Sequence, residues 1–421
     1  MIDSPSPVQT GDHIAFLGAS VTEADPGFSR LFAAMAQALA PQLALRFTFA
    51  GRRGDRVSDL LERVDRDVLL HRPDWVVVQT PTNDLRSAAA DLSMVEAAYR
   101  ALLDRLLSAG ARVVVLPPPL ITEELESPSH ARLRRYGARA RTLAESVGAR
   151  VVPVDVAFEA ALPLRRKALG LPPEGHAGLL TTDGVHPNAV GNALFAVVLA
   201  QALGLPGIPT DGPPLTHGAS LLFLGDSITA ADPGYTRLFG SLLAALHPER
   251  NVRFHYAGVS GNRVGDLLGR LQRDVLSHEP DWVTVSIGVN DVWHRPGGGT
   301  SASDFARDDR LLLHRIVDAG VRPVVLTPTV IFEDLGNEKN RELLELVQLE
   351  REVAHEVGAA VCDLNTIFRR AIEARRGALP EVDWPMGPDG TTRFYTADGV
   401  HMNLAGNALM ALSLLQTLAG G

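Results

Sequence analysis

The sequence predicts an α/β protein made of two homologous copies of one three-layer α/β/α domain, each built on a parallel five-stranded sheet. A repeat is the first observation. "FLGAS" at Phe16–Ser20 returns as "FLGDS" at Phe223–Ser227, and the stretch from Gly51 returns, mostly identical and in register, from Gly258. The second observation is that short apolar runs alternate with amphipathic stretches of helical length. This alternation favours parallel strands joined by helices that cover both faces of a sheet.

The elements of the second copy can be assigned in chain order. Its expected strands are the runs "SLLFLG", "NVRFHYA", "DWVTVSIG", "RPVVLTP" and "AAVCDL", which are short and rich in large apolar or β-branched residues. The stretches "GYTRLFGSLLAALH", "RVGDLLGRLQRDVLSH" and "GNALMALSLLQTL" are long enough, and apolar on one side, to form helices. Right-handed crossovers then give a doubly wound sheet, whose sites lie beyond the carboxyl ends of the strands.

We expect three parts along the chain: the first copy in residues 1–206, a linker in residues 207–217 and the second copy in residues 218–421. The linker is predicted from "LGLPGIPTDGPPLTHG", because its density of proline and glycine interrupts any periodic pattern.

The register of the two copies indicates an ancient duplication. It holds without a gap as far as Asn83 and Asn290, and later drifts until His186 corresponds to His401. A duplicated domain of this kind suggests an intramolecular pseudo-dimer, whose ancestral interface between subunits now lies within one chain.

Composition excludes several classes of protein. The net charge of −9 argues against nucleic acid or an anionic membrane as a partner. The single cysteine, Cys362, cannot form an internal disulfide, and the first residues do not resemble a signal peptide. No apolar run approaches the length of about 20 residues that a membrane helix needs. We therefore expect a cytoplasmic protein with no membrane partner.

Polar residues follow the expected strands of the second copy. "GDSIT" follows the first strand, "AGVSGN" the second and "GVND" the third, and "DGVH" precedes the last helix. Each is consistent with an ordinary turn, since turns favour Gly, Asp, Ser and Asn. However, the carboxyl ends of parallel strands share one edge of the sheet, so together these turns predict a site.

The residue types in these turns match the needs of acyl transfer. Ser227 is the candidate nucleophile, His401 the base that removes its proton, and Asp398 the group that orients the imidazole. The N–H groups of Ser227 and Gly258 and the amide of Asn290 are candidate donors for an oxyanion. The alternative is that Asp398 caps a helix and His401 is solvated. Metal catalysis is a weak competitor, since no ligand motif is present.

The blocks "FLGDSIT", "AGVSGN", "GVND" and "DGVHMN" resemble, in order and spacing, the four blocks of the SGNH hydrolase (GDSL-type esterase) superfamily. The resemblance covers essentially all of the second copy and, more loosely, the first. The second copy is most similar to bacterial members that look like acetylxylan esterases. The resemblance implies a flavodoxin-like sheet, a nucleophile at Ser227, a triad with Asp398 and His401, an oxyanion hole at Gly258 and Asn290, and no cofactor or metal.

The first copy keeps every group of this set, with two changes beside them. The retained residues are Ser20, Asp183 and His186, with Gly51 and Asn83 as oxyanion donors. Ala19 stands where the second copy has Asp226, and Pro81 stands where it has Gly288. Proline fixes φ and removes an N–H, so a positive φ at that glycine cannot be reproduced. Either both sites turn over, the first with altered preference, or the first copy is a degenerate partner.

The expected substrate is a small acyl ester, in particular an acetyl ester, with esters of carbohydrates as one candidate class. Trp293, His294 and Tyr395 are predicted to border the second pocket. Arg52 and Arg53 lie beside Gly51, the predicted oxyanion glycine of the first copy. Two arginines here indicate either that the first site accepts an anionic substrate or simply that these positions are exposed to solvent. Two alternatives stay open at this point: an acyltransferase that uses the same triad, and a two-domain binding protein with a non-catalytic first copy.

Overall fold

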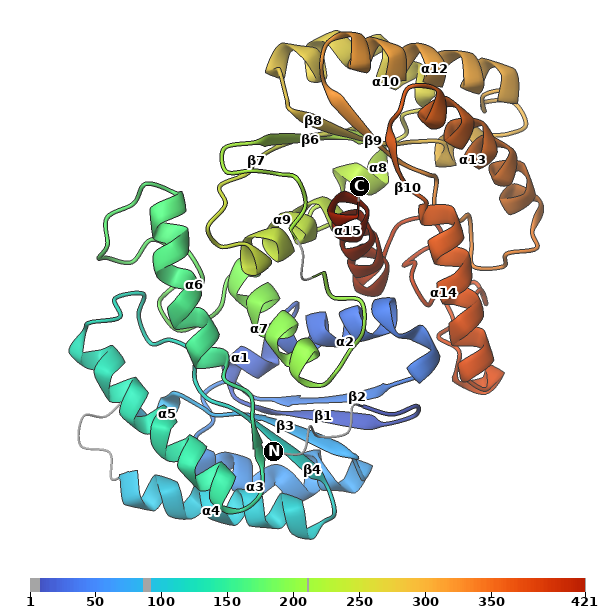
Figure 1. Cartoon of the computed structure of the whole chain (residues 1–421). Helices are drawn as coiled ribbons and strands as arrows, with labels where there is room; N and C mark the ends of the chain where they lie inside the picture. The colour runs from blue at the N-terminus through green and yellow to red at the C-terminus, as the bar shows by residue number, and fades with distance from the viewer. Residues whose placement is uncertain (1–7, 86–91, 210–211, 421) are drawn as a thin grey trace. The chain divides into compact units, whose positions relative to one another are not determined.

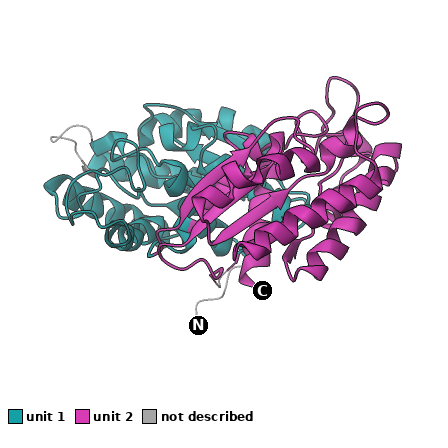
Figure 2. Ribbon diagram, turned by 90° about the horizontal axis from the view of Figure 1, so that it is seen from above, with its two compact units in different colours: residues 1–208, 244–249 teal, residues 209–243, 250–421 magenta. Residues whose placement is uncertain are grey.

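The computed structural model describes residues 8–85, 92–209 and 212–420 and divides into two compact units (Figures 1 and 2). The first unit consists of Met1–Ile208 and Ala244–Glu249, and the second of Pro209–Leu243 and Arg250–Gly421. Residues 210 and 211 of the expected linker, like residues 1–7, 86–91 and 421 of the expected copies, lie outside the described residues.

The sheet of the first unit has five parallel strands in the order β2-β1-β3-β4-β5. The strands are β1 (His13–Gly18), β2 (Arg46–Gly51), β3 (Trp75–Gln79), β4 (Arg112–Leu116) and β5 (Arg150–Val151). Gly18 and Gly51 are direct partners in the register of β1 and β2, so the two strands end side by side. The turns that follow them therefore meet at one edge of the sheet.

Helices cover both faces of this sheet, as Figure 1 shows. The helices α3 (Val57–Asp67), α4 (Leu92–Ser108) and α5 (Pro128–Ser146) pack on one face, and α2 (Phe28–Leu39), α6 (Val154–Ala168) and α7 (Ala189–Ala202) pack on the other. Short turns of helix complete the unit: α1 (Ser20–Glu23), η1 (Pro41–Leu43), η2 (Leu69–His71) and η3 (Asn83–Leu85).

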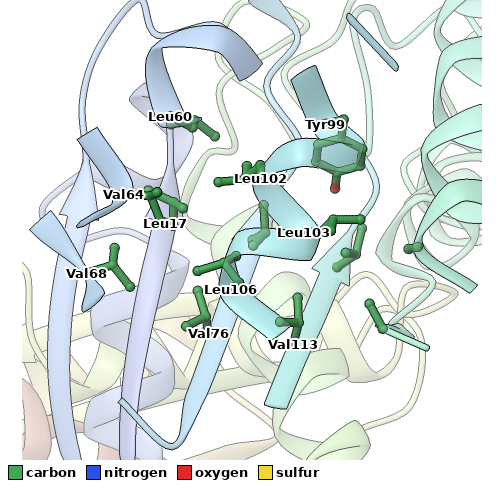
Figure 3. Packing of buried hydrophobic residues seen from close by; sticks show 14 of the residues in the cluster. Leu17, Leu60, Val64, Val68, Val76, Tyr99, Leu102, Leu103, Leu106 and Val113 are labelled. Carbon is green, nitrogen blue, oxygen red and sulfur yellow. The ribbon is translucent and has the colours of Figure 1, made fainter. Parts of the chain in front are cut away.

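The core explains why these segments take these elements. Strand residues such as Leu17, Val76 and Val113 pack against Leu60 of α3 and Leu102 of α4 in one buried cluster (Figure 3). On the opposite face of the sheet an aromatic cluster links β1 to α2, α6 and α7 through Phe16, Phe28, Phe158 and Phe195. The strands are thus apolar on both faces, as expected for a covered parallel sheet.

The second unit repeats the arrangement. Its sheet has the order β10-β9-β8-β6-β7 and all pairs are parallel. The strands are β6 (Ser220–Gly225), β7 (Arg253–Gly258), β8 (Trp282–Ser286), β9 (Arg322–Leu326) and β10 (Ala360–Cys362). Read from β7, this is the same strand order as in the first unit, and it is the order of flavodoxin-like sheets.

The helices of the second unit follow in the same sequence. The helices α10 (Val264–Asp274), α12 (Ala302–Asp318) and α13 (Glu338–Glu356) pack side by side on one face of the sheet. The other long helices are α9 (Tyr235–Leu246), α14 (Leu364–Ala378) and α15 (Leu404–Ala419). The short ones are α8 (Ser227–Ala230), α11 (Val289–Trp293), η4 (Leu276–His278) and η5 (Glu381–Asp383).

The predicted fold class is confirmed: both units are three-layer α/β/α domains with parallel five-stranded sheets. Among the described residues, no helix combines the length and the apolar character that crossing a membrane requires. Within the same residues, no group of His, Cys, Asp and Glu side chains is arranged to hold a metal ion.

Candidate active sites

The candidate nucleophile of the second unit stands where β6 gives way to α8. Ser227 is the first residue of this single-turn helix, and the side chain of Asp226 caps it by accepting a hydrogen bond from the N–H of Ile228 at 2.9 Å. Asp226 is buried, and this burial raises its pKa to about 7 in spite of that hydrogen bond. The cap fixes the turn that presents the hydroxyl of Ser227.

Three side chains that are remote in the chain meet at this point. His401 Nε2 lies 2.9 Å from Ser227 Oγ, and His401 Nδ1 lies 2.7 Å from Asp398 Oδ2. The other oxygen of Asp398 accepts the backbone N–H groups of Val400 and His401, at 2.9 and 2.7 Å. One imidazole therefore bridges a hydroxyl and a carboxylate.

The carboxylate of Asp398 is suited to remain ionised. Partial burial alone would raise its pKa, but the hydrogen bonds from the ring and backbone of His401 and from Val400 outweigh burial and lower the pKa. An ionised carboxylate on Nδ1 leaves Nε2 as the nitrogen that faces Ser227, which is the tautomer that a general base needs.

The predicted oxyanion donors lie beside the nucleophile helix. A Cβ on Gly258 would stand 2.3 Å from the backbone nitrogen of Ala230, so only glycine allows the end of β7 to approach α8 this closely. The buried Asn290 donates one amide hydrogen to the carbonyl of Asn262 at 3.0 Å. This contact fixes the amide plane and leaves its second N–H for another acceptor.

The first unit brings the corresponding residues together with nearly the same geometry. His186 Nε2 lies 2.9 Å from Ser20 Oγ, and its Nδ1 lies 2.7 Å from Asp183 Oδ2. Burial would raise the pKa of Asp183, but hydrogen bonds from His186 and Val185 bring it down to about 2. A Cβ on Gly51 would stand 2.2 Å from the nitrogen of Glu23.

The two departures of the first copy have visible structural counterparts. No side chain caps α1, since Ala19 has no oxygen to offer. In the second unit Gly288 adopts φ 114° and begins the α-helical turn α11, whereas the first unit has Pro81 and delivers Asn83 from the 3₁₀ turn η3. Asn83 still donates to the carbonyl of Asp55, at 2.9 Å.

The predicted substrate-binding residues differ in their exposure to solvent. Trp293 is 38% exposed, and its ring centroid lies 5.4 Å from that of Phe332. His294 is exposed as well. Tyr395, in contrast, is fully buried and packs against Phe368, so the prediction that it borders the pocket is wrong. Sequence reasoning placed its ring in a long loop but had no means of seeing that the loop folds back onto α14.

Two further residues near the triad were missed by sequence reasoning. Phe332 is a half-buried residue with φ 55°, and its N–H donates to the carbonyl of Gly399, between Asp398 and His401, at 2.7 Å. The next residue, Glu333, is a buried carboxylate that accepts hydrogen bonds from the segment leading to Asp398. The available signal was that "ITEEL" in the first copy and "IFEDL" in the second share this glutamate.

Arg52 and Arg53 are exposed, and Arg53 Nε lies 3.9 Å from a carboxylate oxygen of Glu23, in the nucleophile helix of the first unit. In the second unit their places are taken by Val259 and Ser260. The two units thus differ in charge beside otherwise matching candidate catalytic groups.

Comparison with known proteins identifies the family of the chain. The model of the GDSL-like Lipase/Acylhydrolase family matches residues 12–194 and, again, residues 223–409. The chain therefore belongs to the GDSL-like lipase/acylhydrolase family, as a tandem of two such domains. Its class of activity is carboxylic ester hydrolysis.

Individual relatives match the length of one copy. An acetylxylan esterase of Geobacillus stearothermophilus is 27% identical over 227 residues, which are 48% of this chain and 94% of that protein. The crystal structure of Axe2, an acetylxylan esterase from Geobacillus stearothermophilus, aligns at a TM-score of 0.42 with 25% identity, covering 48% of this chain and 95% of that one. LAE5, an alpha/beta hydrolase enzyme from the metagenome of Lake Arreo, Spain, aligns at 0.42 with 27% identity, covering 48% and 96%.

Proposed function

We propose that the second unit hydrolyses small acyl esters, in particular acetyl esters of carbohydrates, through an acyl-enzyme on Ser227. The observation that carries the proposal is the imidazole of His401, which lies within hydrogen-bond distance of both Ser227 and Asp398. Acetyl esters of carbohydrates are favoured because the curated relative is an acetylxylan esterase. The exposed ring of Trp293 and the exposed His294 are the side chains we propose as contacts for the alcohol part.

The mechanism has two half-reactions. In the first, Ser227 Oγ attacks the ester carbonyl carbon while its proton passes to His401 Nε2. The oxyanion that forms accepts hydrogen bonds from the N–H groups of Ser227 and Gly258 and from the amide of Asn290. The intermediate then collapses, the C–O bond to the alcohol breaks, and the leaving oxygen takes the proton from His401.

In the second half-reaction, water replaces the alcohol. His401 removes a proton from the water as its oxygen attacks the acyl carbon, and the bond to Ser227 Oγ breaks as the hydroxyl regains a proton. A carboxylic acid leaves and the enzyme returns to its starting state. The side chains of His401 and Asp398 are about half exposed, at 47% and 57%, which gives water direct access and favours hydrolysis over transfer to another alcohol.

We propose the same chemistry for the first unit, with Ser20, His186 and Asp183 as the triad and with Gly51 and Asn83 as oxyanion donors. Its support is the pair of contacts at 2.9 and 2.7 Å, which equal those of the second unit. The uncapped turn at Ala19 and the proline at position 81 predict a lower rate than at Ser227.

Labelling with a fluorophosphonate, followed by intact-mass measurement, tests both assignments in one experiment. The wild-type chain should gain two labels, Ser227→Ala and Ser20→Ala one each, and the double variant none. On an aryl acetate, Ser227→Ala should remove most of the turnover, since loss of a serine nucleophile costs on the order of 10⁴-fold or more at its own site. Wild-type turnover in Ser227→Ala, or an unlabelled wild-type chain, would contradict the proposal.

A further inference from the structure

We propose that Glu333 is a positioning residue for the catalytic histidine of the second unit, and that Glu123 has this role in the first. The buried carboxylate fastens the segment from which the Asp–His turn projects, and thereby holds His401 at the distance from Ser227 that catalysis needs. The proposal rests on the assignment of Ser227 and His401 made above, and neither glutamate is assumed to touch substrate.

The contacts of Glu333 are directed at one short segment. Its Oε1 accepts the N–H of Tyr395 at 2.7 Å and both the N–H and the hydroxyl of Thr396, at 2.9 and 3.0 Å. Its Oε2 accepts the N–H of Phe394 at 2.8 Å. The side chain is fully buried, so these four donors, and not water, satisfy the carboxylate.

The segment that Glu333 holds is the base of the catalytic turn. Thr396 pairs with Met402 in an antiparallel bridge, and the N–H of Ala397 donates to the carbonyl of His401 at 2.8 Å. Asp398 follows Thr396 by two residues. Because the turn between Thr396 and Met402 is this short, a shift of Thr396 carries Asp398 and His401 with it.

The neighbouring residue fixes the turn at a second point. The N–H of Phe332 donates to the carbonyl of Gly399 at 2.7 Å, and a Cβ on Gly399 would stand 2.3 Å from the Phe332 ring. Phe332 holds φ 55° to make this contact. A backbone in this sparsely populated region persists only where its surroundings determine it. Two consecutive residues after β9 thus hold both the base and the tip of the catalytic turn.

The first unit repeats the glutamate contact, although the loop that leads from α6 to its catalytic turn differs in length and sequence from the loop that follows α14. Glu123 Oε1 accepts the N–H groups of Leu180 and Thr181 at 2.9 and 3.0 Å and the Thr181 hydroxyl at 3.0 Å, and its Oε2 accepts the N–H of Ala177 at 3.1 Å. The loops that lead to the two catalytic turns differ, but the three contacts of Oε1 with Leu180 and Thr181 match those with Tyr395 and Thr396. We therefore infer that the contact serves the catalytic turn rather than the loop.

The chemistry of these contacts requires a carboxylate. All four partners are donors, and a carboxylate is an acceptor only, with room for about four hydrogen bonds. Glutamine has the same shape but would turn an NH₂ group toward backbone N–H groups that also donate. We therefore expect Glu333→Gln to move the turn by up to about 1 Å, and a misplacement of that size costs on the order of 10²-fold in rate.

The test uses Glu333→Gln in a Ser20→Ala chain, in which only Ser227 can react. We expect kcat and the rate constant of fluorophosphonate labelling to fall about 10²-fold, with KM changed less than about threefold. Glu333→Asp, which keeps an acceptor-only group on a shorter stem, should retain more activity than Glu333→Gln. Asp334→Asn is the matched control, since Asp334 is adjacent and exposed, and its carboxylate accepts, among the described residues, only the N–H of Gly336.

A spectroscopic reading separates positioning from general loss of structure. The proton shared by His401 Nδ1 and Asp398 gives a far-downfield NMR signal in a well-formed pair, and we expect Glu333→Gln to weaken or shift it while Asp334→Asn leaves it unchanged. If Glu333→Gln does not fold, Thr396→Val, which removes one of the four donors, should lower kcat about three- to tenfold. The corresponding variants of the first unit, Glu123→Gln and Thr181→Val, should lower kcat at Ser20 in a Ser227→Ala chain and leave kcat at Ser227 unchanged in a Ser20→Ala chain.

The outcomes separate the two proposals. A Ser20→Ala parent that neither labels nor turns over would overturn the assignment of Ser227 before any glutamate variant is made. An active parent whose folded Glu333→Gln or Thr396→Val variant keeps kcat within twofold and the downfield signal unchanged would overturn the positioning role of Glu333 alone.

Discussion

The residue that differs most directly between the two candidate nucleophiles is the one that precedes them. Asp226 caps α8 through its hydrogen bond to Ile228, and Ala19 leaves α1 without a cap. Loss of an N-cap side chain typically costs about 0.5–2 kcal/mol. In a helix of one turn this cost falls on the turn that holds the nucleophile.

We therefore expect Asp226→Ala, in a Ser20→Ala chain, to lower kcat at Ser227 about five- to tenfold, because 1.4 kcal/mol corresponds to a factor of ten. The converse variant, Ala19→Asp in a Ser227→Ala chain, should raise kcat at Ser20. Both are measured as initial rates on an aryl acetate. An Asp226→Ala enzyme with unchanged kcat would show that the cap does not reach the reaction.

Prediction from sequence at this scale succeeds where chemistry restricts the residue type. The meeting of Ser227, Asp398 and His401 was foreseeable because each follows or precedes an element that ends at one edge of the sheet. Tyr395 was misjudged, since an aromatic residue in a loop carries no signal of which way it points. Glu333 was missed, since a glutamate in a turn ordinarily faces water.

At the scale of elements, the turn that carries the asparagine proposed as an oxyanion donor is the clearest contrast between the units. Gly288 holds φ 114°, and a Cβ there would stand 2.6 Å from Pro328 Cγ, so both backbone conformation and space demand glycine. The first unit has Pro81 and a 3₁₀ turn at Asn83–Leu85 instead of the helix at Val289–Trp293.

Gly288→Ala should therefore displace Asn290, destabilise the second unit by about 1–3 kcal/mol, and lower kcat at Ser227 on the order of 10²-fold. Gly320→Ala is the matched control, because Gly320 has φ 78° but open space around its Cβ position. The control should cost stability without lowering kcat. Equal kcat values for the two variants, determined beside their denaturation midpoints, would contradict this account.

Prediction of the elements from sequence was successful where the pattern of hydrophobic residues was clear over the whole length of the element. The expected helix "GYTRLFGSLLAALH" is α9, and the expected strand "SLLFLG" is β6 residue for residue. The difference between α11 and η3 was foreseeable only as a disturbance at Pro81, because a single proline excludes conformations without selecting the replacement.

At the scale of the whole molecule, the two units share a topology but not a set of buried charges. Asp309 on α12 and Glu350 on α13 are buried carboxyl groups whose oxygens have no hydrogen-bond partner in the described part of the chain. In the first unit the corresponding places are taken by Tyr99 and Ala140. The hydroxyl of Tyr99 lies 2.9 Å from that of Thr80.

This difference predicts a contribution to pH-dependent stability that the first unit lacks. Burial, with the nearby Asp291 adding to it and Arg310 opposing it, raises the pKa of Asp309 to about 7. A carboxyl group whose pKa is raised by folding stabilises the folded state below its unfolded pKa. That contribution is lost as the pH rises through the folded pKa, here between about pH 4 and pH 7.

Asp309→Asn should remove that loss, because an amide in the same place does not ionise as the pH rises. We expect the variant to be more stable than the wild type at pH 8 and close to it at pH 4, in urea denaturation followed at both values. Asp318→Asn, an exposed position on the same helix, is the control. A wild-type stability that rises between pH 4 and pH 8, with no gain from Asp309→Asn, would contradict the prediction.

Duplication was the part of the whole-molecule architecture that the sequence made plain, because the motifs recur nearly unchanged and in a register that holds without a gap as far as Asn83 and Asn290. The buried charges were not foreseeable. Asp309 and Glu350 stand in helices full of charged residues, and only the packing of α12 against α13 shows that these two face inward.

Asn83 lies in a 3₁₀ turn and Asn290 in an α-helical turn, and this difference has a consequence for inhibition. A tetrahedral boronate or phosphonate mimics the reaction intermediate, and its charged oxygen must reach whichever amide the turn presents. The two candidate sites have equal serine–histidine distances, but a 3₁₀ turn presents the amide in one and an α-helical turn presents it in the other. We therefore expect them to bind such a mimic with unequal affinity. A single compound would then titrate the chain in two steps, and the order of the steps would identify which turn fits the tetrahedral oxygen better.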